Sequence, residues 1–282
     1  MAPDVAELLD PTERALRRAL HQTFAAARES QSLEAIALAL SRYDVGAVEL
    51  AATSRRGVLA LVLPALLAAY QAAGSAQLAE LGLDGALAFD PTALPARYRS
   101  LVESTVTDIV ADTDAAVRTV MMTGQGTATS AKLVALSAGL TAHRAGTLDA
   151  YRRSLLSVNP PLPAARQAAS LATYASTLLG QRIDALALSL AQRALDAGQA
   201  AAVGQATAAG LLDDNAGWQI WITRDDGHVR RSHVPMHGQR RRLDEPFRSG
   251  NGYALYYPHD PGAPIAETAG CRCRRRYEYG AG

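Results

Sequence analysis

Residues 193–223, "RALDAGQAAAVGQATAAGLLDDNAGWQIWIT", contain the point at which the character of the chain changes. The first part of this stretch is rich in alanine, a composition with high helix propensity. The last part, "GWQIWIT", is a short run of aromatic and β-branched residues that is typical of a strand. The change near residue 215 predicts a helical region over residues 1–215 and a small, different module over residues 216–282.

The region before residue 215 has the periodicity of helices. Leu16, Leu20 and Phe24 are spaced four residues apart and predict one apolar face. Later segments at 32–43, 55–73, 96–122 and 129–156 repeat this spacing. The abundance of alanine gives shallow apolar faces, which suit either a monomeric helical bundle or long helices that pack on a partner.

Prolines and caps predict where these helices begin and end. Asp10 is expected to be an N-cap, with Pro11 at the first helical position. Pro64 is expected to kink or end its helix, because proline cannot continue the hydrogen-bond pattern. Breaks are expected at residues 90–91 and at 157–165, which include "NPPLP". The stretch after the second break predicts two long helices.

The module after residue 215 has the pattern of a small sheet. We expect strands at "GWQIWIT", within "HGQRRRLDEPF" and at "CRCRRRYEY", with a turn-rich segment over residues 248–264. About 65 residues provide little core, so the module is expected to need a staple. The predicted fold class is therefore mainly α, with a long helical N-terminal region and a small α+β C-terminal domain.

Charge and hydropathy exclude some classes of protein. The formal net charge is +1, so the molecule as a whole does not bind polyanions through bulk electrostatics. An uninterrupted run of 18 apolar residues is absent, so we expect no transmembrane helix and no membrane partner. The N-terminus carries acids where a secretory signal would be basic, which indicates a leaderless protein made in the cytoplasm.

The two cysteines and three nearby histidines form the strongest chemical pattern. Two thiols do not make a disulfide framework, and a bridge between residues two apart needs unusual geometry. The residues His233, His237, Cys271 and Cys273 instead offer four ligands, enough for a tetrahedral zinc site. The alternative is that the histidines hydrogen-bond in a polar turn and the cysteines are small strand residues.

A catalytic interpretation is the second alternative for these residues. It assigns a general base to His233 or His237, oriented by Asp225 or Asp226, in a nuclease-like enzyme that acts on nucleic acid. The sequence has no paired-carboxylate metal site and no lysine-containing nuclease motif. We therefore expect a protein that is not an enzyme and has no catalytic residues.

Arginine is concentrated in the module. From residue 216 onward, 11 arginines face seven acids, an excess of about four positive charges. Two runs are candidates for contact with nucleic-acid backbone: Arg240, Arg241 and Arg242, then Arg274, Arg275 and Arg276. On strands, however, half of each run points away from the other half, and solvated surface is the alternative for these side chains.

Five elements in order along residues 185–279 carry a resemblance to a known family. They are "RALDAGQAAAVGQATAAGLL", "WQIWITRDDGHVRRSHVPMHGQ", the pair Pro246–Phe247, a glycine-rich turn, and "YPHDPGAPIAETAGCRC". In this order and register they resemble the phage Mu protein F-like family of minor head, or head morphogenesis, proteins. The helical region before them carries no motif that matches.

The resemblance implies a minor capsid protein of a tailed bacteriophage, prophage or phage-like particle. Such a protein is expected in the virion, in several copies, in contact with the portal protein, the major capsid protein and the packaged DNA. Its role would be structural, in head assembly or in DNA packaging and delivery.

This chain also departs from the family pattern that it resembles. Many members have Cys-x-x-Cys where this chain has Arg230 and His233, and a histidine shortly before the final cysteines, where this chain has Glu267 and Thr268. If the cysteines of that family bind a metal, this member would need His233, His237, Cys271 and Cys273 for it, or would have lost the metal.

Overall fold

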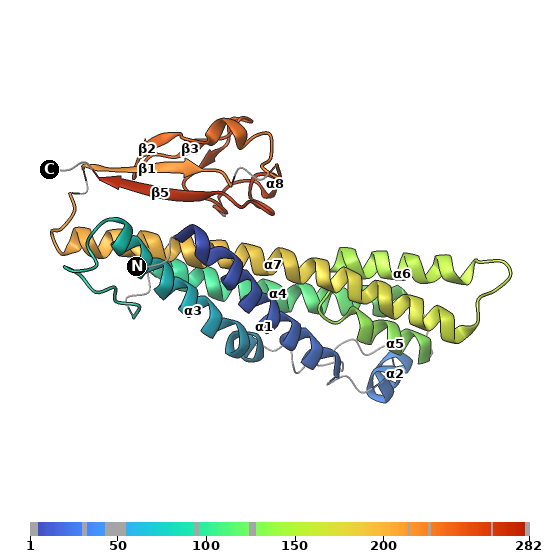
Figure 1. The fold of residues 1–282 in the computed structure, drawn as a ribbon. Coiled ribbons are helices and arrows are strands. Elements are labelled where there is room, and N and C mark those ends of the chain that lie inside the picture. The colour runs from blue at the N-terminus through green and yellow to red at the C-terminus, as the bar shows by residue number, and fades with distance from the viewer. Residues whose placement is uncertain are drawn as a thin grey trace. The chain divides into compact units, whose positions relative to one another are not determined.

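The computed structural model describes residues 5–29, 33–42, 55–92, 96–123, 128–213, 215–224, 227–260 and 262–279. The helices are η1 (Val5–Leu8), α1 (Leu9–Glu29), α2 (Leu33–Ser41), α3 (Arg55–Glu80), α4 (Ala96–Thr123), α5 (Ala128–Ser137), α6 (Ala142–Leu156), α7 (Ala164–Ala208), η4 (Val234–Met236) and α8 (Ile265–Thr268). The strands are β1 (Gly217–Ile222), β2 (Arg240–Arg242), β3 (Phe247–Arg248), β4 (Ala254–Leu255) and β5 (Arg274–Tyr279) (Figure 1).

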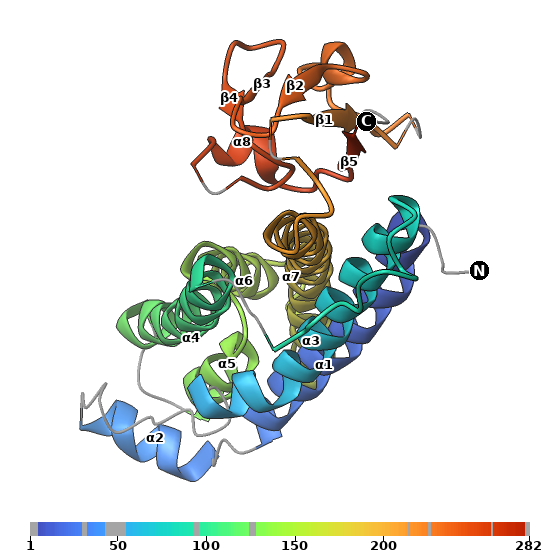
Figure 2. The same ribbon diagram turned by 90° about the vertical axis from the view of Figure 1, so that its left-hand side faces the viewer.

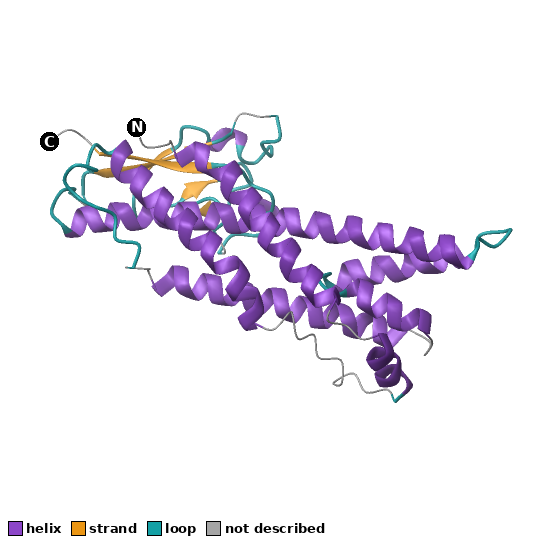
Figure 3. Cartoon of the chain, turned by 60° about the horizontal axis from the view of Figure 1, so that its bottom comes forward, coloured by secondary structure: helices purple, strands orange, loops and turns teal. Residues whose placement is uncertain are grey.

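The predicted fold class is confirmed. The described chain is mainly helical, and its strands all follow residue 216, in a small region at the C-terminal end (Figure 3). β1, β2 and β5 form in the stretches where alternation and β-branched residues predicted them. The loops at residues 90–91 and 157–163 coincide with the predicted proline breaks.

Three helix boundaries differ from the prediction, and at Pro64 the helix continues, which excludes one of the two predicted outcomes there. α1 already includes Leu9, so Asp10 lies in its first turn and is not its N-cap. Pro64 lies inside α3 and does not end it. The segment 128–156 is divided between α5 and α6, whereas residues 164–208 form the single helix α7 and not two. No proline interrupts residues 164–208, and the glycines there are tolerated because the helix is packed along its length.

Contacts divide the chain into two compact units. One comprises Met1–Leu16, Leu63–Arg99 and Ala185–Gly282, and the other Arg17–Val62 and Ser100–Asp184. The helices α1, α3, α4 and α7 each run from one unit into the other. The C-terminal module thus shares its unit with the second half of α7 and most of α3.

In the first unit, α3 and α7 approach each other closely at a glycine. A Cβ atom on Gly198 would lie 2.3 Å from the carbonyl oxygen of Tyr70, so any larger residue would push the helices apart. Beside this contact, the buried Gln199 donates from its amide to the Oε1 atom of Gln77 at 2.7 Å. The bond satisfies the Oε1 atom of Gln77, which would otherwise be costly to bury, whereas Nε2 of Gln77 has no hydrogen-bond partner among the described residues.

The C-terminal module is built on a three-stranded antiparallel sheet with the order β2-β1-β5. The β3–β4 hairpin lies beside this sheet (Figure 2). Trp221 of β1 points into the module and is fully buried, whereas Trp218 on the opposite side of the strand is only partly covered. Among its described residues, the module has a small core cluster that consists of Trp221, Met236, Phe247, Leu255, Cys271 and Cys273.

The second unit is organised around a buried arginine. Arg182 of α7 is 4% exposed and donates from Nη1 to the carbonyls of Gly139 at 2.6 Å and Leu140 at 2.8 Å. These carbonyls belong to the turn between α5 and α6, in which Gly139 adopts a φ of 84°. Burial lowers the pKa of Arg182 to about 10, and Asp112 offsets part of that effect.

Within the described residues, one helical stretch, Gly57–Glu80 of α3, is long and apolar enough to cross a membrane by length and composition. The core helix of a soluble protein passes the same test, so this property is weak evidence for a span. Tyr70 and Ala73 of this helix are fully buried inside the first unit.

Substitution of Gly139 tests the turn that Arg182 holds. We expect Gly139→Ala to lower the free energy of unfolding by more than about 1 kcal/mol, because the residue needs a positive φ. The new Cβ would also lie 2.7 Å from the ring of Phe24. Gly146→Ala in α6 is the control, since no atom lies within 4 Å of its Cβ position, and should stabilise by about 0.5–1 kcal/mol. Chemical denaturation followed by circular dichroism measures both, and equal effects would contradict the prediction.

Candidate functional site

Three residues from two distant segments meet in the core of the module. His233 ends the turn before η4, and Cys271 and Cys273 precede β5. A spacing of two residues places both thiols on one side of an extended chain. All three side chains are buried, with 1% exposure for His233 and 3% for each cysteine.

The three donor atoms have the separations of ligands around one metal ion. The Nδ1 atom of His233 lies 3.5 Å from Sγ of Cys271 and 3.6 Å from Sγ of Cys273. All three atoms lie within 4.8 Å of one another. A tetrahedral zinc ion with bonds of about 2.3 Å to sulfur and about 2.0 Å to nitrogen would separate these atoms by about 3.6 Å. The residues therefore form a possible metal site of the Cys2His type.

Glu267 orients the histidine from the opposite side of its ring. Its Oε2 atom lies 3.1 Å from Nε2 of His233, and both side chains are 1% exposed. Ser232 donates to Oε2 and Asn251 to Oε1, each at 2.8 Å. Burial alone would raise the pKa of Glu267, but these hydrogen bonds and His233 outweigh it and lower the pKa. A carboxylate on the far nitrogen is the usual second partner of a metal-bound histidine.

The two thiols lie close enough to shift each other's pKa. A hydrogen bond from Cys273 lowers the pKa of Cys271 to about 4, with His233 contributing and burial opposing. The same hydrogen bond raises the pKa of Cys273, and burial raises it further. A thiolate is the form of cysteine that binds a metal, so the lowered pKa of Cys271 suits it to that role.

Two residues that the sequence analysis did not select hold the cysteine segment in place. The Nε2 atom of His259 donates to the carbonyl of Cys271 at 2.6 Å, and burial lowers the pKa of this histidine. Arg230 donates from both terminal nitrogens to the carbonyls of Ala266 and Ala269. His259 and Arg230 bind backbone carbonyls and do not contribute metal ligands. The spacing of metal-ligand residues in the sequence therefore could not have identified them.

A cavity of about 370 Å³ borders the three donors. Its remaining wall includes Arg224, Arg230, Arg272 and His228. Arg224 lies at 3.2 Å from Asp10, and Arg272 lies at 3.4 Å from Glu13. The potential metal site is therefore buried on the core side and faces a basic hollow on the other.

The structure brings together three of the four predicted ligands but not the fourth. His237 is exposed, and its Nδ1 atom accepts a hydrogen bond from the backbone N–H of Thr223 at 3.2 Å. It also lies 2.8 Å from the hydroxyl of Thr223. His237 therefore has the role that the alternative interpretation gave it, a hydrogen-bonding residue in a polar turn.

The two nitrogens of His233, the histidine of the catalytic interpretation, both lie close to neighbouring side chains. Nδ1 lies 3.5 and 3.6 Å from the two thiols and Nε2 lies 3.1 Å from Glu267, and the side chain is 1% exposed. The proposed orienting residues, Asp225 and Asp226, lie outside the described part of the chain.

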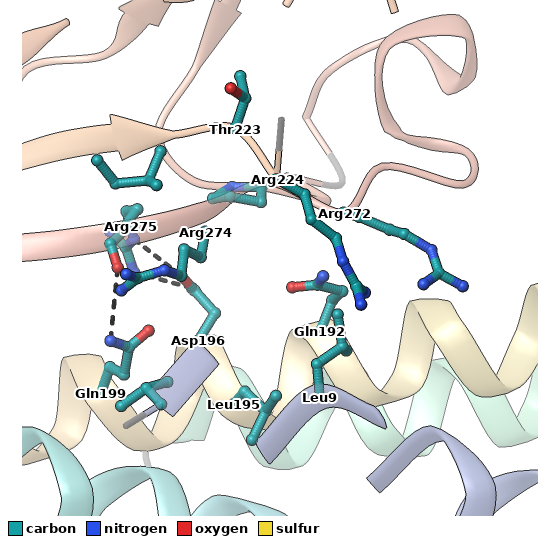
Figure 4. Close-up of a pocket in the computed structure, with 13 residues that line it drawn as sticks. Leu9, Gln192, Leu195, Asp196, Gln199, Thr223, Arg224, Arg272, Arg274 and Arg275 are labelled. Carbon is teal, nitrogen blue, oxygen red and sulfur yellow. Dashed lines mark hydrogen bonds and ion pairs between the residues drawn. The ribbon is translucent and has the colours of Figure 1, made fainter. Parts of the chain in front are cut away.

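Among the six arginines predicted to contact nucleic acid, Arg275 is turned inward. It is 8% exposed and forms two contacts of 2.8 Å with the carboxylate of Asp196 in α7 (Figure 4). Gln199, one turn later in α7, is directed at the carbonyl of Arg275 at 3.5 Å. Arg275 is thus a structural residue, and its prediction as a nucleic-acid contact is wrong. Arg274 lines a separate cavity of about 260 Å³ beside it.

Three other arginines lie together on the opposite face of the sheet. Arg240 and Arg242 lie over the ring of Trp218, with distances of 4.1 and 4.8 Å to its centroid. Arg276 shares this face, because it pairs with Ile220 as Arg240 does, and it contacts Glu278 at 2.7 Å. Arg241 lies on the other side and donates to the carbonyl of Arg240.

Comparisons with known proteins return no match: no family model, no curated protein and no solved structure is significantly similar to this chain.

Removal of Asp196 tests the ion pair with Arg275. We expect Asp196→Ala to lower the free energy of unfolding by about 3 kcal/mol or more, because it leaves a buried guanidinium without its counter-ion. Asp184→Ala is the control on the same helix, since its pair with Arg17 is 40–57% exposed and is worth less than about 1 kcal/mol. Thermal unfolding of the full chain measures both, and similar losses would show that the Arg275 pair is not critical.

Proposed function

We propose that this protein is a minor capsid, or head morphogenesis, protein of a tailed phage or phage-like particle. The observation that supports this is the convergence of the signature residues. Trp221, His233, Glu267, Cys271 and Cys273 all belong to the stretches that resemble the Mu F-like family, and all lie in one buried cluster. A signature that is buried and self-contacting is typical of a structural module.

The metal at this cluster is proposed to be zinc. Two thiolates and an imidazole are ligands that zinc prefers, and the separations of about 3.6 Å fit its tetrahedral geometry. The physical role of zinc would be stabilisation, because the core cluster described in the module is small, with six residues. Zinc would then be the staple that the small module was expected to need.

The helical region is proposed to contact the portal and the inner face of the major capsid shell. Near the turn between α6 and α7, Leu156 is 56% exposed and Val158 is 40% exposed. Leu156 also lines a mainly apolar cavity of about 330 Å³ with Leu155 and Leu171. Apolar side chains in such a position favour a protein partner.

Packaged DNA is the proposed partner of the outer face of the sheet. Arg240, Arg242 and Arg276 are gathered there around Trp218, and arginine with an aromatic side chain suits contact with the nucleic-acid backbone. The protein is proposed to act structurally and not as an enzyme, since His233 is buried with the two thiols near one nitrogen and Glu267 near the other.

Elemental analysis of the purified full chain tests the zinc centre. We expect about one equivalent of zinc, and a strong loss in Cys273→Ala, which removes one of three protein ligands. His237→Ala is the matched control and should retain the metal, because its Nδ1 atom is occupied by Thr223. Zinc below about 0.2 equivalents in the unaltered chain would contradict the centre.

Purified particles test the role in the virion. The protein should co-sediment with particles and be present in few copies compared with the major capsid protein, as quantified by mass spectrometry. His233→Ala, once shown to be folded, should leave any hydrolytic activity of the preparation on DNA unchanged. Absence from particles, abundance equal to that of the shell protein, or a nuclease activity abolished by this substitution would each overturn the proposal.

A further inference from the structure

We propose that the metal ion keeps one coordination position open to the adjoining cavity, and that this position takes a phosphate group held between the metal and Arg230. This inference rests on the proposed zinc centre and adds a ligand to it. It concerns the hollow bordered by the three donors together with Arg224, His228, Arg230 and Arg272.

The number of ligands is the first step. A tetrahedral ion needs four donors, but among the described histidine, cysteine and acidic side chains only three gather here. Glu267 does not supply the fourth, because it lies on the far nitrogen of His233 and is held there by Ser232 and Asn251. The fourth position therefore faces the cavity that the donors border.

Charge is the second step. Two thiolates neutralise the charge of a divalent metal ion. The electrostatic potential in the cavity is then determined by the arginines of its wall. Arg224 and Arg272 each have a carboxylate partner, Asp10 and Glu13. The hydrogen bonds of Arg230 go to the backbone carbonyls of Ala266 and Ala269, which carry no charge. Arg230 contributes to the lowered pKa of the nearby Glu267, but that carboxylate is hydrogen-bonded by Ser232 and Asn251, and no described carboxylate forms an ion pair with Arg230. The cavity consequently favours an anion.

Size and chemistry indicate which anion. The cavity of about 370 Å³ is much larger than the share of one water molecule, which is about 30 Å³. Guanidinium groups pair with oxyanions through charge-assisted hydrogen bonds, and metal ions bind the same oxygens. A phosphate group satisfies both requirements, either as free phosphate or as the terminal phosphate of a nucleic-acid strand.

Cobalt(II) in place of zinc provides the test, because the visible absorption of thiolate-bound cobalt changes when its fourth ligand changes. The full chain loaded with cobalt is titrated with inorganic phosphate, with sodium chloride at equal ionic strength as the control. We expect a saturable spectral change with phosphate only. An oligonucleotide with a 5′-phosphate, compared with the same oligonucleotide ending in a 5′-hydroxyl, distinguishes a nucleic-acid terminus from free phosphate.

Variants test the role of the arginine. Arg230→Gln should weaken phosphate binding about tenfold, the effect of losing one charge-assisted hydrogen bond. Arg231→Gln is the matched control, since Arg231 is exposed and does not border the cavity. The cobalt spectrum without phosphate shows whether Arg230→Gln keeps the centre intact. If it does not, Arg224→Gln on the same wall replaces it, with the same direction of effect expected.

Two results would overturn the inference while leaving the metal centre in place. One is a cobalt spectrum that does not respond to saturating phosphate. The other is a spectrum that changes in His228→Ala before phosphate is added, which would show that His228 closes the fourth position. Failure to bind cobalt at all would instead remove the proposed centre itself.

Discussion

The contact between Glu267 and His233 is the interaction on which the proposed metal centre depends. The Oε2 atom of Glu267 lies 3.1 Å from Nε2 of His233, and a carboxylate on that side favours the tautomer that carries its proton on Nε2. In that tautomer Nδ1, which lies 3.5 and 3.6 Å from the two thiols, is the nitrogen that would coordinate a metal. The buried carboxylate would thus help to select a ligand set from three ordinary side chains.

The small module is stabilised by contacts with α7 as well as by its own core. Its described core cluster has six residues, and Arg275 contacts Asp196 and Gln199 of α7 within the same compact unit. Consecutive arginines commonly lie on the solvated surface. In β5, however, successive side chains point to opposite faces of the sheet, so neighbouring arginines have different environments. Arg276 faces solvent, and Arg275 is buried because a helix offers it a counter-ion.

Local patterns predicted the fold class, the strands and the loops at the prolines, because these depend on neighbours in the chain. The continuity of α7 was not predictable, since glycine lowers helix propensity and only packing shows that Gly198 is needed for contact with Tyr70. Cys-x-Cys with a histidine was enough to suggest a metal. The sequence could not exclude His237, however, because its partner Thr223 lies 14 residues away, and no pattern linked Arg275 to Asp196, 79 residues distant.

The sequence resemblance and the proposed centre meet in one point of chemistry. Many members of the Mu F-like family, which this chain resembles, carry two cysteines where this chain has Arg230 and His233. If four cysteines of that pattern bound zinc, the site would carry a charge of −2 and be closed. The centre proposed for this chain, with two thiolates and an imidazole, would be neutral, and Arg230 borders the adjoining cavity. Under this proposal, Arg230 and His233 favour an anion where four thiolates would repel one.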